Sequence, residues 1–359
     1  MSVYILIILF FAWFYARLYT ISDSKLFRNR EDYYCWILYA ILIFISAFRG
    51  ETVGADTPGY MYDYLSLSEY SFKGVLSKYV DYEGFYISAW VCNKLGMPLQ
   101  LWLGLVSATY IIPVGLLIRR FSKDKLFGIL CFLTMGAFSF SLAGLKQTVA
   151  MGFLILGFLC ITDKRIVLGI IFSIWAYFCH KTSLVFLLLY PFYFLRKAKA
   201  SRILLVVICV MVLFFARSLL TGLLTYMDDE RYMSYLESER VYSSTTFIFY
   251  LTLLLISFIF QGRQVYSEDR STMLFLTNVS ILCVVVQTLS FISASAFRIS
   301  LFFLPFFGIY ISNALHGNSR NIVRYLVMAM VIFFFLYTGR KASYHFIWEG
   351  IHVEESPLV

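Results

Sequence analysis

The sequence predicts an all-α polytopic membrane protein that forms a single transmembrane domain over residues 1–359, with about twelve spans. Composition is the first observation behind this prediction: hydrophobic residues make up 60% of the chain and charged residues only 14%, whereas a soluble domain carries about 25% charged residues. The second observation is that the apolar residues form long runs. The third is that the basic residues recur in alternate loops, as in a protein with a fixed orientation across a bilayer.

The spans are assigned by length, because each needs about 20 apolar residues, or somewhat fewer where flanking side chains reach the headgroups. The first run has no basic region before it and no small-residue cleavage site after it, so we interpret it as a retained span. Segment 84–97 is apolar but short, which predicts a half-helix or re-entrant piece. The predicted spans are 2–20, 33–48, 99–118, 126–143, 145–161, 166–179, 182–195, 203–224, 245–261, 272–291, 298–315 and 322–338.

The orientation follows from six alternate loops that are rich in lysine and arginine, such as 119–125 and 196–202. The positive-inside rule predicts that these loops face the cytoplasm and that both termini lie on the outer side. This pattern requires that segment 84–97 does not cross the membrane, because a crossing would invert every later loop.

Two long outer loops, 49–83 and 225–244, hold most of the acids and many tyrosines. Tyrosine rings and carboxylates suit carbohydrate, since sugar C–H faces stack on rings and sugar hydroxyls donate to carboxylates. Tyrosine belts at membrane interfaces are also routine, so the composition leaves both interpretations open. We expect the two loops to form lids over a site.

Several ionisable side chains on the outer side lie at or within the membrane boundary. Charge at such depth costs at least ~2.5 kcal/mol and usually faces a cavity or a partner. Each residue has a simpler interpretation as a helix-end side chain that reaches the headgroups, a turn residue or half of a structural ion pair. Together they predict a site for a polyanion, which we take to be a lipid phosphate or pyrophosphate. The residues are Arg49, Lys146, His180, Lys181, Arg217 and Arg298.

The stretch FRGETVGADTPGY, residues 48–60, separates the second span from the first long loop. Its three glycines and Pro58 predict a sharp turn that can approach a ligand closely. Asp56 has two interpretations. It either caps the helical turn that follows, or it is an ionised carboxylate beside Arg49 that acts as a base or an orienting partner.

Five segments in order resemble the EpsG/Wzy group of bacterial polysaccharide polymerases over about residues 35–310: FRGETVGADTPGY, YEGFY, LKQTVAMGF, FCHKTSLVF and SAFRISLFFLP. The resemblance implies a multi-pass protein of the bacterial inner (cytoplasmic) membrane, with GT-C-like glycosyltransferase architecture and an active site that faces the periplasm. The family's Arg-Gln pair falls on Lys146 and Gln147, where lysine keeps the charge but loses the bidentate fork. Its Glu-Pro-Gly-Phe pattern falls on 83–85 without the proline, and its histidine falls on His180.

The resemblance implies an oligosaccharide repeat-unit polymerase. The donor would be an undecaprenyl-pyrophosphate-linked glycan, and the acceptor would be the non-reducing-end hydroxyl of a second lipid-linked repeat unit. The expected pyrophosphate-binding residues are Arg49, Lys146, Arg298 and Arg217, whose cations would stabilise the leaving group. The expected base is His180, Asp56 or Glu83, with a slight preference for His180 because its ordinary pKa lies near neutral pH. The expected substrate-binding residues are Thr57, Tyr60, Gln147 and Lys181.

We expect no cofactor and no metal site, because the seven cysteines show no metal-ligand spacing and the cations would replace a metal. The expected partners are membrane lipid, the two lipid-linked glycans and a Wzz-like chain-length regulator, with no nucleic acid. Three other functions stay open: an O-antigen ligase-type glycosyltransferase, a polysaccharide flippase or transporter, and a membrane acyltransferase.

Overall fold

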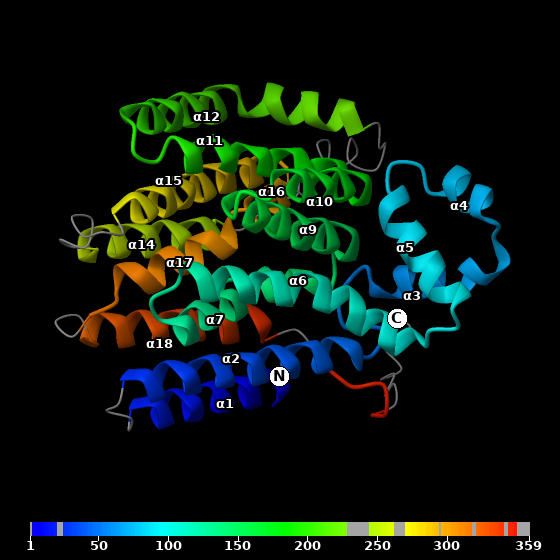
Figure 1. Cartoon of the computed structure of the whole chain (residues 1–359), viewed down its shortest axis with the longest axis horizontal. Coiled ribbons are helices and arrows are strands. Elements are labelled where there is room, and N and C mark those ends of the chain that lie inside the picture. Colours follow the sequence, from blue (N-terminus) through cyan, green and yellow to red (C-terminus); the bar gives the residue numbers. More distant parts are fainter. Residues whose placement is uncertain are drawn as a thin grey trace, which may run out of the picture.

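The computed structural model describes residues 2–19, 24–227, 244–261, 270–293, 296–317, 321–340 and 344–349. Within these ranges every regular element is a helix, and the one β-bridge joins Arg49 to Phe346. The prediction of an all-α fold is therefore confirmed. The long helices lie side by side as a bundle, and a group of short helices sits at one end of it (Figure 1).

Five helices in the described part of the chain are long and apolar enough to cross a membrane: Leu99–Phe121, Leu145–Thr162, Lys199–Ser218, Arg270–Phe291 and Ile322–Gly339. Five shorter apolar helices accompany them: Val3–Leu18, Lys125–Thr134, Ile166–Cys179, Lys181–Phe194 and Thr245–Phe260. The bundle is thus that of a membrane protein, whereas the count of twelve spans and the GT-C architecture stay predictions.

The first half of the bundle is built around α6 and α9. Helix α9 packs against α6 and α10, and α6 packs against α2. The helices of this half are α1 (Ser2–Tyr19), α2 (Ser24–Ala47), α6 (Leu99–Phe121), α7 (Lys125–Thr134), α8 (Ala137–Ser141), α9 (Leu145–Thr162) and α10 (Ile166–Cys179).

The second half is centred on α15 and α17, which pack against each other, while α12 packs against α15 and α17 reaches α7 in the first half. Its elements are η2 (Lys181–Leu188), α11 (Leu189–Phe194), α12 (Lys199–Met227), α14 (Thr245–Phe260), α15 (Arg270–Gln287), η4 (Thr288–Phe291), α16 (Phe297–Ser300), α17 (Leu304–Ala314) and α18 (Asn321–Gly339).

Several predicted spans are not single regular α-helices. Span 126–143 is divided into α7 and α8 at Gly136, whose φ of +102° belongs to the left-handed region that favours glycine. Span 182–195 begins as a 3-10 helix before α11, and span 298–315 is divided into α16 and α17. Apolar composition alone does not reveal these breaks, because the residues on both sides of them are apolar.

Ion pairs hold one end of the bundle together. Lys125 Nζ lies 2.7 Å from Asp32 Oδ1 and 3.2 Å from Glu31 Oε2, and the buried Arg324 contacts Asp124. These pairs connect α2, α7 and α18 at the end of the bundle where the basic loops lie, which the sequence predicts to face the cytoplasm. We call this the basic end; α2 and α18 both start there, at the left of Figure 1.

The predicted outer loop 49–83 is folded rather than irregular. It forms α3 (Thr57–Ser66), η1 (Leu67–Glu69) and α4 (Phe72–Lys78), and α5 (Glu83–Lys94) follows directly. These elements lie at the right of Figure 1, at the end of the bundle away from the basic end. The short α5 matches the predicted half-helix at 84–97. Of the second expected lid, 225–244, residues 228–243 lie outside the described residues, and the lid role of both loops stays a prediction.

Candidate active site

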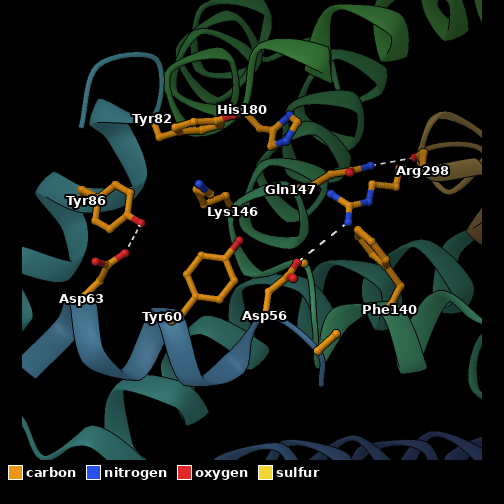
Figure 2. Close-up of a pocket in the computed structure, with 13 residues that line it drawn as sticks. Asp56, Tyr60, Asp63, Tyr82, Tyr86, Phe140, Lys146, Gln147, His180 and Arg298 are labelled. Atoms are coloured by element: carbon orange, nitrogen blue, oxygen red, sulfur yellow. Dashed lines mark hydrogen bonds and ion pairs between the residues drawn. The ribbon is translucent and has the colours of Figure 1, made fainter. Parts of the chain in front are cut away.

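A cavity of about 390 Å³ lies where the short helices meet the bundle. Its walls come from α3, α5, the start of α9, the junction of α10 with η2, and α16 (Figure 2). The lining residues are Ala55, Asp56, Gly59, Tyr60, Asp63, Tyr82, Tyr86, Phe140, Gly144, Lys146, Gln147, His180 and Arg298. Six residues that the sequence predicts for the site therefore share one cavity: Asp56, Tyr60, Lys146, Gln147, His180 and Arg298.

The motif 48–60 is fixed against the connection between α8 and α9. Gly54 has φ +95°, and a Cβ atom there would lie 2.2 Å from the carbonyl oxygen of Leu142, so only glycine fits. The Thr57 hydroxyl donates to the carbonyl oxygens of Val53 and Leu142, both at 2.9 Å. Thr57 is fully buried and does not line the cavity. The structure thus gives Thr57 a positioning role in the motif rather than the predicted substrate contact.

Lys146 lies in the first turn of α9, surrounded by tyrosine rings. Its Nζ atom is 3.6 Å from the ring centroid of Tyr82 and 5.7 Å from the centroids of Tyr60 and Tyr86. Such distances allow cation–π attraction, which orients the ammonium group. Lys146 also lies at the N-terminal end of α9, where the helix dipole adds positive potential.

Arg298 and Asp56 form a loose ion pair across the cavity, with Nη2 and Oδ2 3.9 Å apart. Gln147 Nε2 donates to the backbone oxygen of Arg298 at 2.7 Å, which ties α16 to α9. The pairing corrects the expectation that Asp56 lies beside Arg49. Asp56 occupies the N-cap position of α3, but its side chain makes no capping hydrogen bond. Its carboxylate points into the cavity, toward Arg298 (Figure 2).

His180 separates α10 from η2 and is largely buried. Its Nδ1 atom lies 2.6 Å from the Thr182 hydroxyl oxygen, and its ring centroid lies 5.7 Å from that of Tyr82. The Thr182 hydroxyl can accept from Nδ1 or donate to it, so this contact fits either tautomer of His180. In the tautomer with a protonated Nδ1, Nε2 is the ring atom that acts as a base.

Asp63 is a cavity residue that the sequence analysis did not assign to the site. It accepts hydrogen bonds from the hydroxyls of Tyr86, at 2.5 Å, and Tyr79, at 3.2 Å. Burial and the adjacent Asp63 carboxylate raise the pKa of Tyr86, so its phenol stays protonated as a donor. Helical spacing was the available signal: Gly59, Tyr60 and Asp63 fall on one face of a helix at i, i+1 and i+4.

Besides Thr57, four predicted site residues lie outside the cavity lining. Arg217 is exposed on α12. Lys181 pairs with Asp81 at 2.5 Å, which connects η2 to the turn before α5. Glu83 is in the first turn of α5, where its negative charge interacts favourably with the helix dipole.

Arg49, the fourth of these residues, is fully buried. It donates to the carbonyl oxygen of Ser46 at the end of α2, and its backbone pairs with Phe346 of the C-terminal segment. Burial lowers its pKa to about 10 although Tyr344 and Tyr4 oppose the shift, so the guanidinium stays charged at neutral pH. Arg49 therefore connects the end of α2 to the C-terminal segment and does not line the cavity; its predicted role in binding pyrophosphate stays a prediction.

A model of the EpsG family matches residues 32–348. The chain belongs to the EpsG family. The match covers most of the chain and every residue that lines the cavity, and it confirms the resemblance found in the motifs. No curated protein and no solved structure matches the chain. Membership of the EpsG family, with the apolar helices, indicates a membrane protein with a polysaccharide polymerase type of function.

The described residues contain no group of three or more His, Cys, Asp or Glu side chains that could hold a metal ion. The residues in the cavity offer cations, hydroxyls and two carboxylates, Asp56 and Asp63. This EpsG-family site is thus equipped to bind an anion beside a polyol, and metal independence stays a prediction.

Proposed function

We propose that this EpsG-family protein is a repeat-unit polymerase of the glycosyltransferase type. It transfers an undecaprenyl-pyrophosphate-linked glycan to the non-reducing-end hydroxyl of another lipid-linked repeat unit. The observation that carries the proposal is the single cavity in which Lys146 and Arg298 lie with His180 and Asp63. Glycosyl transfer needs both a stabilised leaving group and an activated hydroxyl, and this cavity contains groups for each.

The diphosphate is assigned to the cationic side of the cavity. Lys146, Arg298 and the start of α9 are positive groups held in place before the substrate arrives. Preorganised donors of this kind stabilise the charge that develops on a leaving group, because they need no reorganisation during the reaction. The loose pair with Asp56 leaves the Arg298 side chain 30% exposed and accessible to a phosphate.

The acceptor sugar is assigned to the side formed by Asp63, Tyr60 and Tyr86, at the left of Figure 2. Carboxylate oxygens accept hydrogen bonds from sugar hydroxyls, and tyrosine rings pack against sugar C–H faces. His180 lies at the upper edge between the two sides in Figure 2 and is the proposed base, with Asp56 as the second candidate. In one transfer the sugar–pyrophosphate bond breaks and the glycosidic bond forms. The proton of the acceptor hydroxyl moves to the base, and the pyrophosphate leaves with the carrier lipid.

The proposed orientation follows from the basic end. The short helices and the cavity lie at the opposite end of the bundle from the ion pairs of the basic loops. By the positive-inside rule the cavity would face the periplasm, with the protein in the bacterial inner membrane. An apolar groove of about 570 Å³ between α9, α10 and η2 includes Phe178, close in sequence to His180, and offers a lateral place for the polyprenyl tail.

The proposal is tested by complementation of a polymerase-deficient strain with K146Q, R298Q and H180N at verified membrane expression. We expect loss of long polymer and retention of single-repeat product on the carrier. R217Q is the matched control, because Arg217 is a cation outside the cavity lining, and it should restore polymer. Normal polymer length in all three cavity variants would contradict the proposal. Long chains accumulating on the carrier would instead indicate the ligase function.

A further inference from the structure

A second cavity, of about 390 Å³, lies at the basic end between the starts of α12 and α15. The turn after α11 closes its side. Five of its lining residues are cations, and the described residues that line it include no carboxylate. We call it the basic-end cavity. Its cations are Arg196, Lys197, Lys199, Arg202 and Arg270.

The lining of the basic-end cavity is ordered by contacts between buried side chains. Asn278 Nδ2 donates to Ser201 Oγ at 2.8 Å, and both residues are buried, so this bond fixes α15 against α12. The Arg196 guanidinium lies 4.0 Å from the ring centroid of Tyr193 and donates to its carbonyl oxygen. Its Nε atom is buried and has no hydrogen-bond partner among the residues that the structure describes. The Asn278–Ser201 bond therefore holds α12 and α15 together at the basic-end cavity.

The helix geometry makes these cations unfavourable without an anion. Lys199 is the first residue of α12 and Arg202 is in its first turn, and Arg270 is the first residue of α15 that the structure describes. A helix N-terminus carries a positive partial charge and favours acidic side chains, not basic ones. The start of α12 and five cations around one cavity raise the free energy of the unliganded state, and a bound anion offsets this cost.

The neighbouring surface of α12 indicates what carries that anion. From the cavity toward the middle of the bundle, α12 exposes apolar side chains, among them Ile203, Val206, Val207 and Val210. We propose that the basic-end cavity binds the phosphate group of an anionic phospholipid, whose acyl chains lie along this face of α12. The site is separate from the proposed active site, which lies at the other end of the bundle.

The test measures thermal stability of the full-length protein in detergent, titrated with phosphatidylglycerol, phosphatidylcholine or inorganic phosphate. Phosphatidylglycerol should raise Tm in a saturable way, because a ligand that binds only the native state stabilises it. In K199Q/R202Q its apparent affinity should fall roughly twenty-five-fold, since each cation near an anionic surface contributes about fivefold. R28Q/R30Q is the matched control: it removes two exposed cations at the start of α2 and should bind as the wild type does.

Native mass spectrometry of the wild type gives a measurement that needs no variant, and it should detect retained anionic phospholipid. An equal loss of affinity in both double variants would overturn the proposal, because it would show only general attraction to the basic end. Equal stabilisation by inorganic phosphate would overturn the lipid assignment in favour of a soluble phosphate. No effect of any ligand would also overturn it, as expected if Glu268 and Asp269, next to Arg270 in sequence, already neutralise these cations.

Discussion

Replacing Gly59 with leucine tests the function of the cavity with little effect on the stability of the protein. Gly59 lies inside α3 and lines the cavity, and a Cβ atom there would meet no other atom within 4 Å. The Cβ atom of a leucine therefore fits, and we expect the rest of its side chain to project into the cavity. Replacing a glycine in a helix by a residue with a Cβ atom stabilises the helix by up to about 0.5–1 kcal/mol.

We thus expect G59L to be as stable as the wild type or slightly more stable, while polymerisation falls about tenfold or more. A tenfold fall corresponds to about 1.4 kcal/mol of lost transition-state stabilisation. The assay is polymer yield and chain length in membranes with matched protein levels, together with Tm of the purified protein. G59A should give a similar gain in stability with a smaller loss of activity, because its side chain is shorter.

Gly222 offers a matched control for the same substitution. It lies in α12, away from the cavity lining, and a Cβ atom there also meets nothing within 4 Å. G222L should keep full polymerisation. If G59L polymerises at the wild-type rate while correctly folded, then this cavity is not where the substrates meet.

Three further predictions concern single residues. K146R should keep polymerisation, since the EpsG/Wzy pattern has arginine there, whereas K146Q should lose it; both are measured by polymer length. G54A should lower the unfolding free energy by more than about 1–2 kcal/mol, measured by chemical or thermal unfolding, because φ is +95° and Leu142 blocks the Cβ position. D124A should cost about 3–5 kcal/mol in the same measurement, since it removes the acidic partner of the buried Arg324, which keeps its contact with Tyr15, and removes the cap on Phe127 N–H. R120Q, which breaks an exposed pair, should cost less than about 1 kcal/mol.

The parts of the site that sequence could predict are those carried by motifs. Lys146, His180 and Arg298 were singled out because a charge in an apolar run is costly unless it faces a cavity or a partner, and all three line one cavity. Arg49 and Arg217, which the same reasoning predicts for the site, do not line this cavity. Hydropathy gives the depth of a residue along a helix, but it does not say which side of the helix the residue faces or what its neighbours are.

Other features depended on contacts that only the folded chain has. Asp63 was one acid among many in a tyrosine-rich loop until α3 placed it on the same face as Tyr60. Gly136 lies within an apolar run that the sequence predicts to be one continuous span, because glycine is tolerated in membrane helices. Its positive φ divides this run, and only the structure shows that φ. The all-helical fold, in contrast, followed from composition and length alone.

The most direct test is an experimental structure of the protein with undecaprenyl pyrophosphate bound. We expect the diphosphate between Lys146 Nζ and the Arg298 guanidinium, at the start of α9, with the polyprenyl chain leaving toward the groove beside α10. A diphosphate bound instead at Arg49, at Arg217 or in the basic-end cavity would contradict the proposed active site.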